Sequence, residues 1–239
     1  MRALLETRGL VMRFGGVTAV DEVDFRLEEG ELRCLIGPNG AGKSTFFKCL
    51  TGQYVPTAGA ILFRDQPIAG CNSHDIARLG VGIKTQVPNV FNGLTAHENI
   101  WVSARRGRTP REAARLLDEV MGRVGIADLT GRIVGELAHG QRQLVELAIV
   151  LAGEPALILL DEPAAGMTHD ETERLAAIIR DINRTQALIV VEHDMQFVRM
   201  IARRVTVFHQ GAVLIDDDVS VVMRDPRVRD VYLGKRVAA

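Results

Sequence analysis

One glycine-rich segment restricts the possible folds of this chain more than any other feature. It follows a short aliphatic run at 32–36 and precedes a helical pattern that continues through Leu50. Glycines allow the backbone to turn its N–H groups inward around phosphate oxygens, and the positive end of the following helix attracts the same group. The segment consists of Gly37, Pro38, Asn39, Gly40, Ala41, Gly42, Lys43 and Ser44, with Thr45 next to it. This order of strand, loop and helix predicts a nucleoside triphosphate site.

Two segments divide the expected phosphate and metal chemistry between them. In the first, Lys43 neutralises charge on the β- and γ-phosphates, and the Ser44 hydroxyl is a ligand for Mg²⁺. In the second, the aliphatic run 157–160 ends in Asp161 and Glu162. Asp161 is placed to hold Mg²⁺, and Glu162 to accept a proton from the attacking water as a general base. A GTPase is the first alternative, but no Asn-Lys-x-Asp segment that would read guanine is present, so ATP is the expected nucleotide.

The hydrophobic pattern predicts an α/β fold. Buried strands are expected at 32–36, 157–160, 188–191 and 205–208, with helices between several of them. Two helices have clear start signals, because Thr109 with Glu112 and Thr168 with Glu171 have the spacing of capping boxes. Strands that alternate with helices form a mainly parallel sheet. The mainly helical stretch 87–153 interrupts this alternation and is expected to be an insertion in a single nucleotide-binding unit over 1–239.

Composition excludes several classes of protein. The chain has 239 residues, 47% of them hydrophobic, and a formal net charge of −1, which argues against disorder and against a general nucleic-acid binder. The longest apolar run, 147–153, is far shorter than the roughly 20 residues of a membrane span. An acidic residue at position 6 interrupts any secretory signal, so the cytoplasm is the expected location. Cys34, Cys49 and Cys71 lack metal-site spacing and are expected to be reduced thiols.

Five more segments carry a recognisable pattern. They are Phe14 within 12–16, Gln86 within 84–86, the run 137–141, the run 164–167, and His193 within 191–194. In order and spacing they resemble the adenine-stacking aromatic, Q-loop, LSGGQ signature, D-loop and switch histidine of the ATP-binding cassette (ABC) ATPase family. Each motif alone has an ordinary structural explanation, and it is their joint order that makes the resemblance specific.

The resemblance implies a fold and roles for individual residues. The implied fold is a P-loop NTPase (RecA-like) core with an inserted helical subdomain and an N-terminal antiparallel β part. Phe14 would stack on adenine, Gln86 would contact Mg²⁺ or water, and His193 would contact the γ-phosphate beside Glu162. The signature residues, which would cover the ATP of a second cassette in a head-to-tail dimer, are Ala138, His139, Gly140 and Gln141.

Two signature residues depart from the family pattern. Ala138 replaces a serine, which removes a hydroxyl that would donate to the γ-phosphate, and His139 replaces the first glycine of a pair. We therefore expect main-chain N–H groups to hold the facing phosphate, with His139 as a further donor. An Ala138→Ser variant tests this expectation.

The chain resembles the ATPase subunits of branched-chain amino acid and urea importers over the segments 9–20, 30–52, 162–167, 192–195 and 231–234. Such systems contain two membrane permeases, a second ABC ATPase, identical or different, and a separate solute-binding protein. The cassettes lie on the cytoplasmic face of the membrane as peripheral subunits. The segment from Gln86 through Val87, Val90, Phe91 and Leu94 is expected to contact a permease. The motifs are split between urea and amino acid members, so both solutes stay open.

Three other functions remain as alternatives. The closing segment 228–234 also resembles the ATPase of lipopolysaccharide export, although Ala138 and His139 count against an exporter. A non-transport cytosolic cassette for DNA repair or translation would need long insertions or two cassettes in one chain. A scaffold that binds ATP without hydrolysing it would not need both Glu162 and His193.

Overall fold

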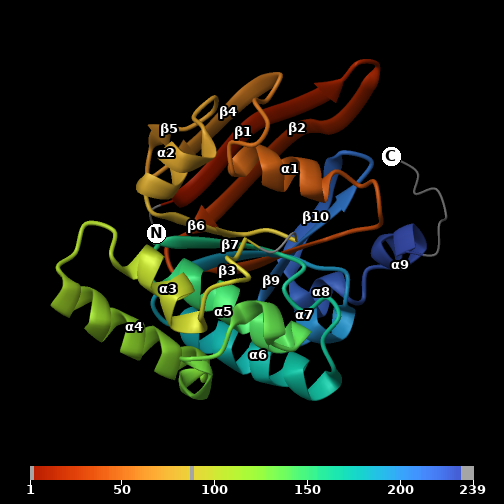
Figure 1. The fold of residues 1–239 in the computed structure, drawn as a ribbon. Helices are drawn as coiled ribbons and strands as arrows, with labels where there is room; N and C mark the ends of the chain where they lie inside the picture. Colours follow the sequence, from red (N-terminus) through yellow and green to blue (C-terminus); the bar gives the residue numbers. More distant parts are fainter. Residues whose placement is uncertain (1–2, 87–88, 233–239) are drawn as a thin grey trace.

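Two β-sheets form the framework of the computed structural model, which describes residues 3–86 and 89–232 (Figure 1). The first sheet is antiparallel, with strand order β2-β1-β4-β5. Its strands are β1 (Ala3–Phe14), β2 (Val17–Glu28), β4 (Ala58–Phe63) and β5 (Gln66–Pro67). It is the N-terminal β part that the family resemblance implies.

The second sheet has the order β10-β9-β3-β8-β7-β6, and only β10 runs antiparallel to its neighbour. Its strands are β3 (Leu32–Ile36), β6 (Val81–Lys84), β7 (Leu157–Asp161), β8 (Ala187–Val191), β9 (Arg204–His209) and β10 (Ala212–Asp218). All four strands predicted from the sequence are present, within one residue at either end. Because β3, β7 and β8 are parallel, their carboxyl ends meet at one edge, where ligands bind in open α/β sheets.

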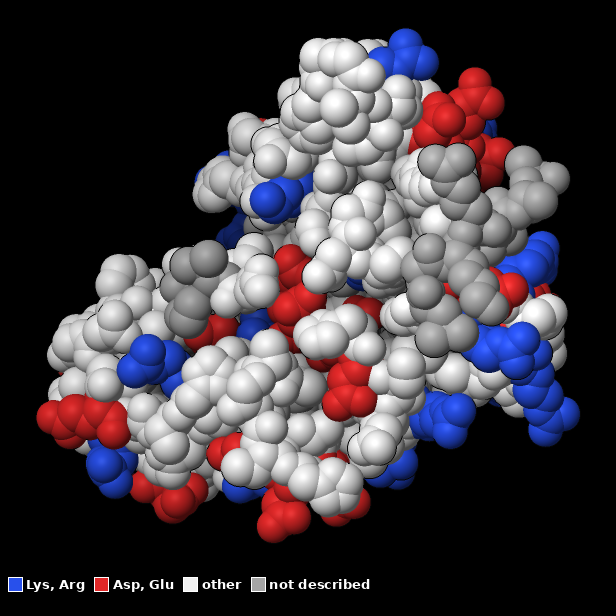
Figure 2. All heavy atoms as spheres, turned by 90° about the vertical axis from the view of Figure 1, so that its right-hand side faces the viewer, with Lys and Arg blue, Asp and Glu red and all other residues white. Residues whose placement is uncertain are grey.

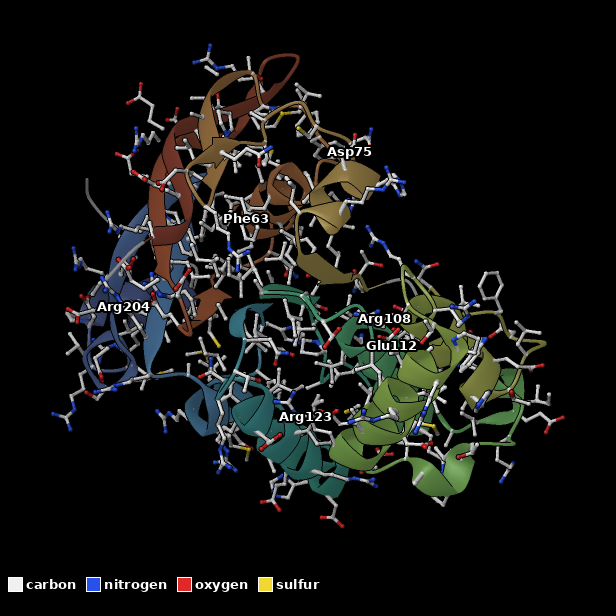
Figure 3. The ribbon with its side chains drawn as sticks, turned by 90° about the vertical axis from the view of Figure 1, so that its left-hand side faces the viewer. Phe63, Asp75, Arg108, Glu112, Arg123 and Arg204 are labelled. Atoms are coloured by element: carbon white, nitrogen blue, oxygen red, sulfur yellow. The ribbon has the colours of Figure 1, made fainter. Side chains whose placement is uncertain are left out.

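A hydrophobic core lies on each face of the second sheet, and alternate residues of one strand belong to different cores. Ile158 and Leu160 join the core on the side of the larger helices, whereas Leu157 and Leu159 join the core beneath the antiparallel sheet. Phe63 of β4, labelled in Figure 3, belongs to the second core. This arrangement explains the continuous apolar runs, because a strand buried on both faces needs no polar side.

Helices cover both faces of this sheet, and two further short helices follow the last strand of the chain. Those outside the insertion are α1 (Lys43–Leu50), α2 (Ser73–Arg78), α6 (His169–Ile182), α7 (Met195–Ile201), α8 (Val219–Val222) and α9 (Pro226–Tyr232). The helix α6 begins as predicted, because Thr168 accepts a hydrogen bond from the Glu171 N–H and Glu171 caps the Thr168 N–H in return. Figure 1 shows α1 between the two sheets and α6 below the second one.

The stretch between β6 and β7 is helical and forms a lobe at one side of the molecule (Figure 1). It contains α3 (Ala96–Ala104), α4 (Pro110–Val124), α5 (His139–Leu151) and two short 3₁₀ turns at Ala127–Leu129 and Val134–Glu136. Thr109 and Glu112 form the predicted capping box of α4, which ends at Gly125 with φ 70°. The expected first residue of the insertion, position 87, lies outside the described residues.

Polar contacts join the lobe to the core of the molecule. Arg123 of α4 points toward α6 in Figure 3, and its Nε donates to Asp181 Oδ2 at 2.8 Å. Its Nη2 donates to the Asp181 carbonyl at 3.0 Å and to Thr185 Oγ1 at 3.1 Å. The Arg123 hydrogen bond lowers the pKa of Asp181. The lobe therefore has a defined position against α6.

Two smaller expectations concern thiols and membrane spans. Cys34, Cys49 and Cys71 are free, as predicted, and burial raises the pKa of Cys49 to about 11. Of the helices in residues 3–86 and 89–232, none is long and apolar enough to cross a bilayer. The face in Figure 2 carries charges of both signs, with acidic atoms near its middle and basic atoms gathered toward one side.

Candidate functional site

The glycine-rich segment connects β3 to α1, as its sequence context predicts. Gly37 and Gly42 have φ of 146° and 103°, and a Cβ there would lie 2.3 Å from the Phe208 carbonyl oxygen and 2.4 Å from that of Ala19. Only glycine fits at these two positions, because backbone atoms occupy the space. Among the residues that the structure describes, no side chain caps the start of α1, so the first N–H groups of this helix face the loop without a side-chain acceptor.

Lys43 lies within the loop rather than in solvent. Its Nζ donates to the carbonyl oxygens of Gly37 at 2.7 Å and Pro38 at 3.1 Å. Burial lowers the pKa of Lys43, while the nearby carboxylates of Glu162 and Asp161 raise it. The ammonium group is therefore held at the loop by weak neutral acceptors, which an anionic phosphate oxygen can replace.

Three predicted catalytic residues meet at the carboxyl edge of the sheet, although they come from distant parts of the sequence. Glu162 follows β7, and its Oε1 lies 3.4 Å from His193 Nδ1 beyond β8. Its Oε2 accepts a hydrogen bond from Gln86 Nε2 at 3.2 Å. Each carboxylate oxygen of Glu162 thus has one partner. A general base needs this kind of fixed orientation toward its water.

Asp161 occupies the last position of β7, beside the general-base candidate. Burial raises the pKa of Asp161, the neighbouring Glu162 carboxylate raises it further, and Lys48 and Lys84 lower it. Asp161 and Gln86 line the same hollow of about 230 Å³ with Lys48 and Gln53. No cluster of three His, Cys, Asp or Glu side chains suited to a metal occurs in residues 3–86 and 89–232. The Asp161 carboxylate and the Gln86 amide oxygen are the kind of oxygen ligand that Mg²⁺ binds together with substrate phosphates.

Phe14 is an exposed aromatic at the end of β1. Its ring meets Tyr54 edge-on, with centroids 5.2 Å apart, and Lys48 Nζ lies 5.4 Å from the Tyr54 ring. Phe14 therefore lies beside α1, the helix that follows the glycine-rich segment 37–44 (the phosphate loop), and Phe14 is 44% exposed. Sequence reasoning missed Tyr54, which no motif marks. Stacking of Phe14 on adenine stays a prediction.

The signature segment forms the start of α5. Ala138 lacks a side-chain acceptor, and the cap is instead formed by Gln141 Oε1, which accepts from the Ala138 N–H at 3.2 Å. The Glu171 carboxylate packs against Gly140, where a Cβ would lie 2.2 Å from Oε1. His139 Nε2 lies 2.9 Å from the carbonyl oxygen of Ala165, in the D-loop of the same chain. The predicted contact of the signature with a second cassette stays a prediction.

Two residues that sequence reasoning missed also lie at this edge. Glu192 follows β8, is 1% exposed, and accepts hydrogen bonds from the backbone N–H groups of Ala164 at 3.2 Å and His193 at 3.1 Å. The position of Glu192, directly after an all-apolar strand, was the sequence signal that could have identified it. Burial raises the pKa of Tyr232 on α9, and the nearby backbone of Gly37 in the glycine-rich segment opposes that rise. No local sequence signal predicts that contact.

Comparison with known proteins agrees with this geometry. A family model described as ABC transporter matches residues 20–165. The chain is 37% identical to the high-affinity branched-chain amino acid transport ATP-binding protein BraF of Pseudomonas aeruginosa, over 98% of this chain and 99% of that protein. It is 36% identical to LivG of Escherichia coli, a protein of the same description, over 97% and 98%.

Solved structures show the same architecture. The ADP conformation of MJ1267, an ATP-binding cassette of an ABC transporter, superposes with a TM-score of 0.88 and 24% identity, over 98% of this chain and 100% of that one. CbiO1 from Clostridium perfringens, part of the ABC transporter complex cbiONQ, gives 0.87 with 26% identity over 98% and 96%. The ABC ATPase fold implied by the motifs is confirmed, and the chain belongs to the ABC transporter family.

Proposed function

We propose that this chain is the ATP-binding and ATP-hydrolysing subunit of an ABC importer. The observation that carries the proposal is the Glu162 carboxylate, whose two oxygens face Gln86 and His193 at the sheet edge next to Asp161. The phosphate loop lies at the same edge, at the end of β3. A general base, its orienting partners and a phosphate cradle are the parts that phosphoryl transfer to water requires.

The residues of this chain suggest how hydrolysis would proceed. When ATP binds, its phosphate oxygens would take the place of the carbonyl oxygens that now accept hydrogen bonds from Lys43. They would also accept hydrogen bonds from the backbone N–H groups of the loop and of the start of α1. Glu162 would accept a proton from the attacking water, while Gln86 and His193 keep the carboxylate oriented. Ser44, Asp161 and Gln86 would hold Mg²⁺, which supplies neutralisation of charge on the phosphates.

The same proposal includes partners at the membrane. Phe91 is 62% exposed, and its backbone is held by the buried Asn99, whose Oδ1 accepts from the Phe91 N–H at 2.8 Å and whose Nδ2 donates to the Phe91 carbonyl at 3.1 Å. An apolar ring displayed on a fixed backbone suits a docking contact. Two permease subunits, reached through this segment, and a second cassette facing the signature would place the chain on the cytoplasmic face of the membrane. A solute-binding protein would act indirectly.

The relatives also favour a substrate. BraF and LivG, which match over nearly their full lengths, are described as branched-chain amino acid transport proteins. We therefore favour a branched-chain amino acid over urea as the solute. Uptake of labelled leucine and labelled urea, by cells with and without this chain, tests the choice. Loss of urea uptake alone would contradict it.

Glu162→Gln tests the ATPase. Because the amide cannot accept the proton, ATP turnover should fall by about 10²–10⁴-fold. Binding of a fluorescent ATP analogue should stay within about threefold, since the phosphate loop is untouched. Glu119→Gln, an exposed change on α4, is the matched control and should leave both quantities unaltered. Unchanged turnover of Glu162→Gln would overturn the assignment of the general base.

A further inference from the structure

The D-loop residues Ala164 and Ala165 are held from two sides within one chain. The Ala164 N–H donates to Glu192 Oε1 at 3.2 Å, and the Ala165 carbonyl oxygen lies 2.9 Å from His139 Nε2. One partner belongs to the catalytic edge of the sheet, and the other to the first turn of α5. The backbone of two consecutive residues, Ala164 and Ala165, thus connects the catalytic edge of the sheet to α5.

On the catalytic side, one buried carboxylate organises two loops. Glu192 Oε2 accepts from the His193 N–H at 3.1 Å, while Oε1 accepts from Ala164. The backbone N–H of Glu192 donates to the Leu35 carbonyl at 3.1 Å, so the residue is fixed to β3 itself. A displacement of the His193 loop therefore acts on Ala164 through a single rigid group.

On the signature side, His139 Nε2 lies 2.9 Å from the Ala165 carbonyl oxygen and 3.2 Å from Gln143 Nε2. Because a carbonyl oxygen can only accept, His139 donates to Ala165 in the tautomer that carries its proton on Nε2. The next residue, Gly166, has φ +73°, and a Cβ there would lie 3.2 Å from His139 Nε2. The D-loop backbone therefore leaves the space that the imidazole fills. A glycine at position 139 could not make this bond.

We infer that His139 and Glu192 are positioning residues that link the two ATP sites of the dimer. The path runs from the His193 backbone through Glu192 to Ala164, and from Ala165 through His139 to α5. The inference rests on the proposed function, in which His193 faces the ATP of its own chain and α5 covers the ATP of the second cassette. Loss of the γ-phosphate at one site would then shift the helix that holds the nucleotide at the other.

The test uses the transporter complex isolated from native cells through a tag on this chain. In His139→Ala, the Hill coefficient of ATP turnover should fall from about 2 toward about 1, because the two sites lose their link. In His139→Gln, whose amide keeps an N–H donor, the coefficient should stay nearer the wild-type value. His169→Ala is the matched control, because the His169 side chain is 66% exposed at the start of α6 and lies 3.3 Å from the similarly exposed Glu173 on the same helix.

A second measurement reads the link directly. Amide hydrogen exchange across 163–168 in the purified chain should be faster in His139→Ala than in wild type. An unchanged Hill coefficient in His139→Ala, or equal values for the Ala and Gln variants, would overturn the inference. If the isolated complex contains neither permeases nor a second cassette, the proposed function itself fails, and the inference fails with it.

Discussion

Lys84 and Glu146 form a buried ion pair that joins the sheet to the inserted lobe. Lys84 ends β6, two residues before Gln86, and its Nζ lies 3.4 Å from Glu146 Oε2 on α5. Their side chains are 3% and 4% exposed. Glu146 Oε1 has no hydrogen-bond partner among the described residues. Lys84→Met would leave the Glu146 carboxylate in the interior without its ion-pair partner.

The expected loss can be stated in magnitude. Removing one partner of a buried pair costs about 3–5 kcal/mol, whereas replacing both with apolar residues of similar size is often neutral. For a chain of this length, that cost corresponds to a fall in Tm of about 6–20 °C, at about 2–4 °C per kcal/mol. The double variant Lys84→Met with Glu146→Leu should recover most of the loss. The difference between the double variant and the sum of the singles isolates the pair.

The stability of Lys84→Met should also depend on pH, and the direction of that dependence is a second test of the buried pair. Burial raises the pKa of Glu146 above 4.5 in the folded protein, and Lys84 partly opposes that rise. Without Lys84, the folded state therefore binds a proton that the unfolded state has released. Stability of Lys84→Met should decrease as pH rises from about 4.5 through the raised folded pKa. Its deficit relative to wild type should thus be smaller at pH 5.5 than at pH 7.

Urea unfolding at both pH values measures these quantities. Lys48→Met is the control, because Lys48 is only partly buried on α1 and lies over the Tyr54 ring rather than in an ion pair. A cost below about 1 kcal/mol for Lys84→Met, a value typical of exposed pairs, would refute the argument. A double variant no more stable than the worse single variant would refute it as well.

Three further predictions concern the nucleotide site and its surroundings. Gly42→Ala should weaken ATP binding by about tenfold or more, because its Cβ would lie 2.4 Å from the Ala19 carbonyl oxygen. Gly40→Ala should weaken binding less, because a Cβ at position 40 would meet no described atom within 4 Å. Equal ATP affinities of the two variants by titration would contradict this prediction. Phe14→Ala should raise the KM for ATP by about fivefold or more through lost stacking, without changing kcat, and an unchanged KM would show that adenine binds elsewhere. Phe91→Ala should reduce copurification of permease subunits and leave ATP affinity unaltered, and lost ATP binding would instead indicate a structural role.

Much of the fold could be predicted because its signals are local. Thr109 and Glu112 form their capping box within one helical turn, and Gly125 ends the helix with a positive φ, so neither depends on the rest of the chain. The strands 32–36 and 157–160 were recognisable because burial on both faces removes polar residues from the sequence. The phosphate loop is likewise a contiguous segment whose glycine positions follow from backbone geometry alone.

The remaining contacts depend on how distant segments pack. Gln86 meets Glu162 across 76 residues, and Arg123 meets Asp181 across 58, at distances that strand register and helix packing determine. Glu192 lies next to the motif histidine and Tyr232 within the segment 228–234, but no role is predicted for either residue, because their contacts form only when distant segments converge.

The sequence by itself determined the family, the phosphate loop and the identity of the acid that would serve as general base. Only the tertiary structure decided which groups hold that acid, and that His139 contacts Ala165 of its own chain. The physical reason is that backbone propensity and capping act over a few residues. Hydrogen-bond partners across the sheet edge are instead selected by the packing of the whole core.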